Sequence, residues 1–446
     1  MEKLVLVHLS DIHFTGSSGT VHDLDVNVRN ELRRDAASLT RQLGPATGVL
    51  VTGDIAFSGK KEEYQYAADW LREFCAAVDC PEQNVSVVPG NHDVDRKLAG
   101  DLITKMLHQS IRETEGPATD SKLREFFSNA QSANALLAPL AEYNVFAARY
   151  GCSVSAKVPY WQRDLALSCG TVIRMRGLSS AFVSNAEDDK GKMILGTAQA
   201  GVPREDGVLY LTLCHHPPEW LRDQDSVEDH LKSKVHIQLF GHKHAQRVDV
   251  INEKVRLVAG AMHPERRERD WVPTYNILEI SRRDADHINL RLFQRRWHQS
   301  ETCFVADRNP NNGMEYRDFK WPGFPRRVRV GESVISPPQV TKPETPAVPH
   351  VVPTTVVDPE AAPASDSARL LTFRFLTLPS LVRYEIALKL GLLREEDDAL
   401  PRESLFLEVF KRAVDARLLA KLWTETEQRH NDPAPINPFQ NSQPGE

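Results

Sequence analysis

Side chains that bind metal ions or transfer protons gather in five short stretches, each directly behind an apolar run. The stretches are Asp11-Ile12-His13, Gly53-Asp54, Gly90-Asn91-His92-Asp93, His215-His216 and Gly241-His242-Lys243-His244. Imidazole nitrogens mixed with carboxylate and amide oxygens, without thiolates, suit manganese, iron or zinc better than calcium. A lone Gly-Asp is commonly only a turn. Five such stretches in this order favour a metal site.

Apolar runs rich in β-branched residues precede these stretches and predict buried strands. They cover residues 4–9, 48–51, 85–88, 208–214 and 235–240. Residues 28–43 and 62–78 carry apolar side chains at helical spacing, so strands alternate with helices. This alternation predicts an α/β fold with largely parallel central strands. In such sheets ligands bind beyond the carboxyl ends of the strands, where the polar side chains would converge.

The ordered set D-x-H, G-D, G-N-H-D, H and G-H-x-H resembles the calcineurin-like metallophosphoesterase superfamily over residues 4–245. Strand-like segments at 255–259 and 274–280 extend the same scaffold. The resemblance implies a four-layer αββα sandwich, in which two sheets pack face to face between helices. Residues 96–150 interrupt the strand rhythm with a helical pattern, which predicts a helical insertion near the site.

The resemblance also implies two groups of metal ligands at the strand ends. The ligands expected for the first metal are Asp11, His13 and His244. The ligands expected for the second metal are Asn91, His215 and His242.

Four further residues receive roles by the same resemblance. Asp54 should bridge the two metals. His92 should neutralise the phosphate or protonate the leaving group, with Asp93 orienting it. His216 is expected to be a structural residue or to lie behind the ligands.

Two divalent cations roughly 3.5–4 Å apart can activate a water molecule and stabilise the attacking and leaving oxygens of a phosphoryl displacement. The resemblance therefore implies a metal-dependent phosphoesterase, with manganese favoured over iron and zinc. We expect a phosphodiesterase acting on nucleotides or nucleic acid. One alternative is a DNA or RNA nuclease specifically, which a basic stretch around residues 282–329 leaves open. Another is a scaffold without catalysis that acts by protein binding.

Proline and small residues dominate positions 333–368, which predicts an extended linker between two units. We expect a metallophosphoesterase domain at 1–332, a small all-α domain at 369–431 and a disordered tail at 432–446. In the all-α domain, Gly391 should end one helix and Pro401 should open another. This region resembles the effector-associated adaptor domains of bacterial conflict systems. The resemblance implies a protein partner and a setting in bacterial defence, and self-association is the alternative.

Composition limits the remaining possibilities. A formal charge of −6 over 446 residues argues against a globally basic nucleic-acid binder. Six cysteines without a CxxC pair indicate reduced thiols and a cytoplasmic protein. No stretch of about eighteen apolar residues occurs, so we expect no membrane partner.

Overall fold

The structure is a computed structural model. It describes residues 3–262, 272–282, 287–322, 371, 374–375, 378, 380–394 and 402–429. The chain divides into two compact units, Met1–Glu332 and Ser333–Glu446. The predicted linker at 333–368 and tail at 432–446 lie outside the described residues, and the predicted domain boundaries remain predictions. Among the described residues, no helix combines the length and apolar character needed to cross a bilayer.

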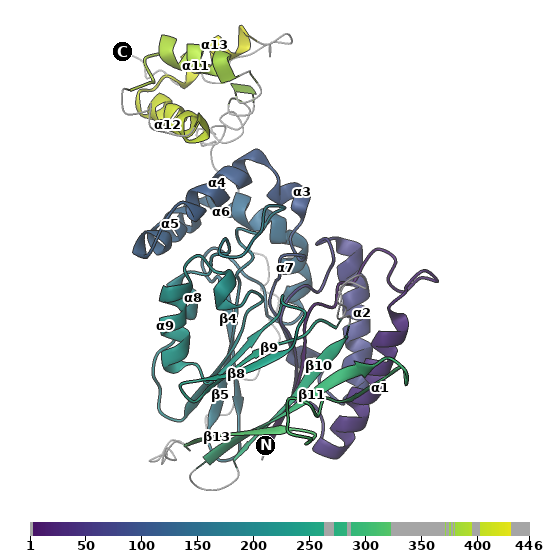
Figure 1. Cartoon of the computed structure of the whole chain (residues 1–446). Coiled ribbons are helices and arrows are strands. Elements are labelled where there is room, and N and C mark those ends of the chain that lie inside the picture. The colour runs from purple at the N-terminus through teal and green to yellow at the C-terminus, as the bar shows by residue number, and fades with distance from the viewer. Residues whose placement is uncertain are drawn as a thin grey trace, which may run out of the picture. The chain divides into compact units, whose positions relative to one another are not determined.

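The first unit contains two β-sheets, which Figure 1 shows between helices. The first sheet runs in the order β12-β11-β10-β1-β2-β3, with β13 paired to β11. Its strands are β1 (Lys3–Leu9), β2 (Gly48–Val51), β3 (Val85–Val87), β10 (Thr274–Arg282), β11 (His287–His298), β12 (Cys303–Ala306) and β13 (Arg317–Pro322). Strands β1, β2 and β3 are parallel, and the other pairings are antiparallel.

The second sheet runs in the order β4-β5-β6-β7-β9-β8. Its strands are β4 (Tyr160–Ala166), β5 (Val172–Leu178), β6 (Val208–Leu213), β7 (Ile237–Phe240), β8 (Arg247–Ile251) and β9 (Lys254–Val258). The four strands β5, β6, β7 and β9 are parallel, and β4 and β8 pair antiparallel at the edges. The predicted parallel centre is confirmed in both sheets.

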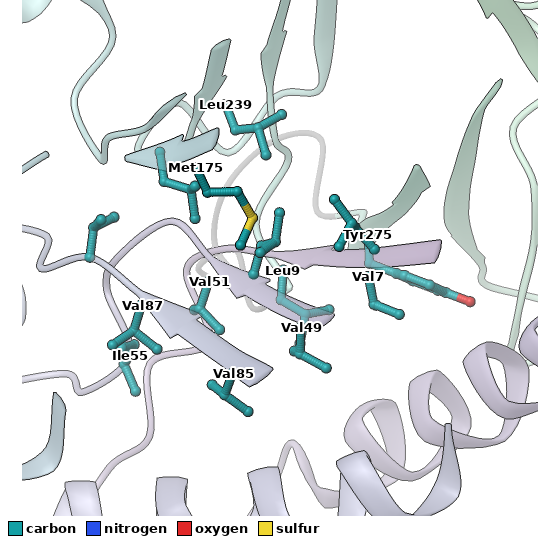
Figure 2. Close-up of a cluster of buried hydrophobic side chains, with 14 of the residues drawn as sticks. Val7, Leu9, Val49, Val51, Ile55, Val85, Val87, Met175, Leu239 and Tyr275 are labelled. Carbon is teal, nitrogen blue, oxygen red and sulfur yellow. The ribbon is translucent and has the colours of Figure 1, made fainter. Parts of the chain in front are cut away.

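Alternate residues of the central strands form the core between the two sheets. The strand registers align Val7, Val49 and Val85 in one row. A second row aligns Leu9, Val51 and Val87. Because successive strand residues point to opposite faces, each row presents one continuous apolar surface. Figure 2 shows these side chains together with Met175 of β5 and Leu239 of β7 from the other sheet.

Helices cover the outer faces of the sandwich (Figure 1). Helices α1 (Val26–Leu43) and α2 (Lys61–Ala77) lie beside the first sheet, and α8 (Thr197–Ala200) and α9 (Gln224–Lys234) lie beside the second. Helix α2 is fixed at its start because Glu63 accepts the N–H groups of Ser58 and Lys60, both at 3.0 Å. The predicted four-layer αββα arrangement is confirmed.

The predicted helical insertion is present and begins just beyond Asp93. Its helices are α3 (Arg96–Ala99), α4 (Leu102–Arg112), α5 (Pro117–Ser128), α6 (Ala130–Leu137) and α7 (Ala141–Ala148). Short 3-10 turns lie at Glu82–Asn84, Ala138–Leu140 and Pro218–Trp220. Arg112 donates to Asp188 at 2.9 Å and Thr197 N–H donates to Asp120 at 2.8 Å. These bonds tie the insertion to the segment between β5 and β6.

The second unit is all-α over its described residues, as predicted. Its helices are α11 (Ser380–Lys389), α12 (Arg402–Asp415) and α13 (Leu419–Glu427). Gly391 follows α11 with a φ of 65°, a conformation that favours glycine and ends a helix. Pro401 lies outside the described residues. Phe375, Phe406 and Trp423 are buried in its small core.

Candidate metal centre

The predicted metal ligands, which are scattered over more than two hundred positions, converge beyond the carboxyl ends of β1, β2, β3, β6 and β7. Within each of four groups, the potential ligand atoms lie within 4.8 Å of one another. The groups are Asp11-His13-His244, Asp11-Asp54-His215, His13-Asp54-His92 and His215-His216-His242. The shared members join the groups into one cluster.

Left-handed backbone turns aim these side chains. Five residues of the cluster have positive φ values that non-glycine residues rarely adopt. They are Asp11 (53°), His13 (54°), Asp54 (52°), His242 (72°) and His244 (55°). Such conformations cost of order 1–3 kcal/mol each and persist where the surrounding structure imposes them. Here the N–H of Asp11 donates to Gly53 O at 3.1 Å and that of His13 donates to Asp54 O at 3.0 Å.

Two glycines permit close approach to the carboxylates. A Cβ atom at Gly90 would lie 2.1 Å from Asp54 Oδ1. One at Gly241 would lie 2.2 Å from Ser10 Oγ, 2.7 Å from the Thr52 carbonyl and 3.0 Å from Asp11 Oδ2. The glycine before Asn91 is therefore required by the Asp54 carboxylate, and the glycine before His242 by the residues packed around Asp11.

One half of the cluster brings three potential ligand atoms together. Asn91 Oδ1 lies 3.1 Å from His215 Nε2 and 3.0 Å from His242 Nδ1. His215 Nδ1 lies 2.8 Å from the carbonyl of Thr52, which can only accept, so Nδ1 carries the proton and Nε2 has a lone pair in the neutral ring. A lone pair facing a carbonyl oxygen at this distance needs a proton or a cation between them. These residues fit a divalent cation.

The other half of the cluster is built around Asp11. Its Oδ2 accepts the N–H of His242 at 3.2 Å and the hydroxyl of Ser10. Its buried Oδ1 has no hydrogen-bond partner and lies 3.5 Å from His244 Nε2. An unsatisfied buried carboxylate oxygen is costly unless a cation compensates it. His13 Nε2 completes this half, 3.4 Å from Asp54 Oδ2.

Residues 4–246, more than half of the 446-residue chain, match the family model of calcineurin-like phosphoesterases. The chain belongs to the calcineurin-like phosphoesterase family. The family predicted from the sequence is thereby confirmed, and with it a metal-dependent phosphoesterase. Residues 367–428 match the model of the GTPase-associated adaptor domain, so the adaptor resemblance is confirmed as well.

Solved structures are similar at low identity. Vps29 of Entamoeba histolytica complexed with Zn²⁺ is 12% identical, with a TM-score of 0.30, over 68% of this chain and 97% of that one. Vps29 of Cryptosporidium parvum is 12% identical, with a TM-score of 0.31, over 73% and 100%. A predicted phosphoesterase of Streptococcus pneumoniae is 11% identical, with a TM-score of 0.26, over 66% and 90%. Comparison with curated proteins gave no match.

The electrostatics of the phosphoesterase site favour positive charge. Burial would raise the pKa of Asp54, but the charge of His215 and the hydrogen bonds of His13 and His215 hold that pKa well below its usual value. Burial would lower the pKa of His215, but the charge of Asp54 and its hydrogen bond raise it to about 9. Without a metal, the His215 ring is therefore positively charged at neutral pH, with a second proton on Nε2. A cation that takes the place of this proton would satisfy the same carboxylate.

His92 lies beside the ligands, and its ring centroid is 4.8 Å from that of His13. Its Nδ1 donates to the carbonyl of Phe57 at 2.8 Å, and its backbone N–H donates to Asp54 Oδ1 at 2.8 Å. Burial lowers the pKa of His92, and the charge of Asp54 opposes this shift only partly. These two hydrogen bonds hold the His92 ring in one orientation, and neither of them uses Nε2.

The orienting role that we predicted for Asp93 belongs instead to the Phe57 carbonyl. The buried Asp93 carboxylate accepts the N–H groups of Gly90 at 2.9 Å and Ala56 at 2.9 Å, and the hydroxyl of Tyr64 at 3.0 Å. Burial and the charge of Asp54 raise the pKa of Asp93 to about 6, against these hydrogen bonds. Neighbours along a loop can point apart, and here Asp93 fixes the backbone of two ligand loops.

Several contributors carry no recognisable sequence motif. Thr52 sets the tautomer of His215 through its carbonyl, and Phe57 does the same for His92. Trp220 places its ring edge-on to His242, with centroids 4.0 Å apart. Only Phe57 gave a signal in the sequence, as a large aromatic residue in the loop directly behind Gly53-Asp54.

Proposed function

We propose that the protein is a two-metal phosphodiesterase acting on nucleotides or nucleic acid, and that its C-terminal helical unit brings it to a protein partner. The observation that carries the proposal is the meeting of two ligand sets at one carboxylate. Asp54 Oδ2 lies 3.4 Å from His13 Nε2 and 3.2 Å from His215 Nε2. A bridging residue must reach both sets in this way.

Each ligand set has its own donors. We assign Asp11, His13 and His244 to one cation. We assign Asn91, His215 and His242 to the other. When bound, two divalent cations activate water and stabilise the charge that develops on the phosphoryl oxygens. The mixture of imidazole, carboxylate and amide donors is compatible with manganese, iron or zinc, and we propose manganese for the first assays.

His92 is proposed as the residue that donates a proton to the leaving oxygen. Its Nδ1–H is committed to the Phe57 carbonyl, so Nε2 is the atom that can hold the transferred proton. Burial keeps the free ring neutral at neutral pH, and an anionic substrate beside it would raise its pKa. A group whose protonation follows substrate binding suits general acid catalysis.

Phe57 supports a substrate with an aromatic base. Its side chain is 50% exposed although its backbone N–H is fixed to Phe14 O at 2.9 Å. The ring lies against His92, with centroids 5.2 Å apart and an interplanar angle of 35°. Half of this aromatic side chain is therefore exposed beside the proposed acid. Stacking of a base on such a ring contributes about 1–3 kcal/mol.

A nuclease receives less support from the basic stretch than the sequence suggested. Arg295 donates to Asp35 at 2.8 Å, and Arg291 lies 3.5 Å from Glu279 and 3.6 Å from Asp318. Arg295 is thus paired with a carboxylate of α1, and Arg291 lies beside carboxylates of the first sheet, so both guanidinium groups already serve ion pairs within the first unit. Positions 283–286 and 323–329 of the stretch lie outside the described residues. We keep nucleic acid as a substrate to be tested.

The adaptor match at 367–428 supports a protein partner for the second unit. We propose that this partner carries a domain of the same type and that the pair works in bacterial defence. The cysteine pattern, with six thiols and no CxxC pair, supports a reducing compartment such as the cytoplasm.

A substrate panel tests the function. The purified full chain would be loaded with manganese and given bis(p-nitrophenyl) phosphate, cyclic nucleotides, single- and double-stranded DNA, RNA and phosphomonoesters. We expect metal-dependent hydrolysis of diesters, with cyclic nucleotides or nucleic acid preferred. A protein that binds no metal and hydrolyses no member of the panel would instead be a scaffold.

A further inference from the structure

His216 is a histidine that the two ligand sets leave unused. It is fully buried, and its ring centroid lies 4.6 Å from that of His242 and 4.8 Å from that of His215. One ligand nitrogen of each of the three rings lies within 4.8 Å of the others. The ring centroid of Trp220 lies 4.0 Å from that of His242 and 6.2 Å from that of His216. Three imidazole rings therefore lie side by side.

The two nitrogens of His216 have unequal surroundings. Nδ1 lies 2.8 Å from Ser180 Oγ, whereas the buried Nε2 has no hydrogen-bond partner. Leaving a buried polar atom unsatisfied costs about 1–3 kcal/mol. A cation bound to this nitrogen would remove that cost.

Ser180 contacts His216 at two atoms. Its Oγ accepts the backbone N–H of His216 at 3.3 Å and lies 2.8 Å from Nδ1. In the tautomer in which Nδ1 donates to this oxygen, Nε2 carries a lone pair and can bind a cation. A hydrogen bond at the distal nitrogen that fixes the tautomer is usual for histidines that bind metals.

We propose that His216 is an additional ligand of the cation assigned to Asn91, His215 and His242. The inference rests on the proposed two-metal centre and specifies its chemistry. The second cation would then have three imidazoles, whereas the first has two, His13 and His244, beside carboxylates. Additional imidazole nitrogens favour zinc or iron over manganese. The two positions should therefore differ in metal preference.

Metal titration of the full chain tests this proposal without turnover. Metal-free protein would be titrated with Co²⁺ and followed by its visible absorption, and Zn²⁺ and Mn²⁺ affinities would be measured by chelator competition. The wild type should bind two Co²⁺ ions. His216→Phe should keep one tight site, lose affinity at the other by at least about 100-fold, and show a smaller preference of that site for zinc over manganese.

Two further variants separate ligation from packing. Ser180→Ala removes the group that sets the tautomer and should weaken the same site by about 10–100-fold, even if His216→Phe does not fold. His236→Gln is the matched control, because His236 precedes β7 at the end opposite to His242, with its Nδ1 accepting the N–H of Tyr210 at 3.3 Å. This control should bind both ions as the wild type does.

The outcomes are distinguishable. A wild type that binds no Co²⁺ would overturn the proposed metal centre itself. A wild type that binds two ions, with the same affinities and zinc preference in the His216 and Ser180 variants, would overturn only the role of His216. Ser180→Ala could also lower the thermal stability and leave the metal affinity unchanged. That result would likewise overturn the role, because it would show that His216 only stabilises the fold.

Discussion

Substitution of Gly90 by alanine should disable the site through a single added carbon atom. The new Cβ would lie 2.1 Å from Asp54 Oδ1 and 2.6 Å from Asp54 N, whereas ordinary contact begins near 3.4 Å. The carboxylate or its loop must therefore move by about 1.3 Å, which is the difference between 3.4 and 2.1 Å. A misplacement of about 1 Å at a catalytic site can cost roughly 100-fold in rate. We expect a loss of at least this size in kcat/KM.

The assay is manganese-dependent hydrolysis of bis(p-nitrophenyl) phosphate, together with metal content and thermal unfolding. Overpacking should also reduce the free energy of unfolding by about 1–3 kcal/mol. Gly16→Ala is the control, because no atom lies within 4 Å of its added Cβ and its φ is not positive. It should keep full activity. If Gly90→Ala matched the parent in kcat/KM and metal content, Asp54 would not be the tightly placed bridge that we describe.

Four other predictions have defined outcomes. Asp54→Asn and His92→Ala should each abolish hydrolysis while circular dichroism shows the fold retained; unchanged turnover in both would refute their roles. Phe57→Ala should raise KM for a nucleotide diester about tenfold or more, as expected for a lost base stack, and Phe57→Tyr should not; equal KM values would exclude stacking. His108 is buried, and its pKa is lowered from 6.5 to about 3, first by burial and then by the charge of Arg112. Between these two pH values, His108 is protonated in the unfolded chain and neutral in the folded chain. Stability should therefore fall as pH drops from 6.5 toward 3, by up to roughly 1.4 kcal/mol per pH unit, and thermal melts of His108→Gln should show a shallower fall; parallel curves would contradict this. Deletion of residues 369–446 should leave hydrolysis of a small diester intact, and its loss would place the helical unit in the active site.

Much of the fold was predictable from the sequence because the central strands are buried on both faces. Strands β1, β2, β6 and β7 are mostly apolar and almost fully buried, and the predicted ranges agree with their observed bounds within two residues. The edge strands β4 and β8 are half-exposed and lack such runs, so periodicity did not predict them. The second sheet was expected only from the family resemblance.

The ligands were predictable because their residue types and their order along the chain are unusual. The contacts around each ligand were not predictable. The left-handed turns at Asp11 and His242 depend on distant hydrogen bonds that no local pattern encodes. The partner of His92 Nδ1 is the Phe57 carbonyl, from a loop 35 residues away, whereas the family resemblance pointed to Asp93. The contact of Ser180 with His216 spans 36 residues and exists only in the folded protein.

The most direct test of the two-metal centre is the anomalous scattering from a crystal of the full chain soaked with manganese. We predict two peaks, both next to the carboxylate of Asp54. The residues expected beside one peak are Asp11, His13 and His244, and those beside the other are Asn91, His215 and His242. A crystal with no peak at Asp54, or with manganese bound only elsewhere, would contradict the account.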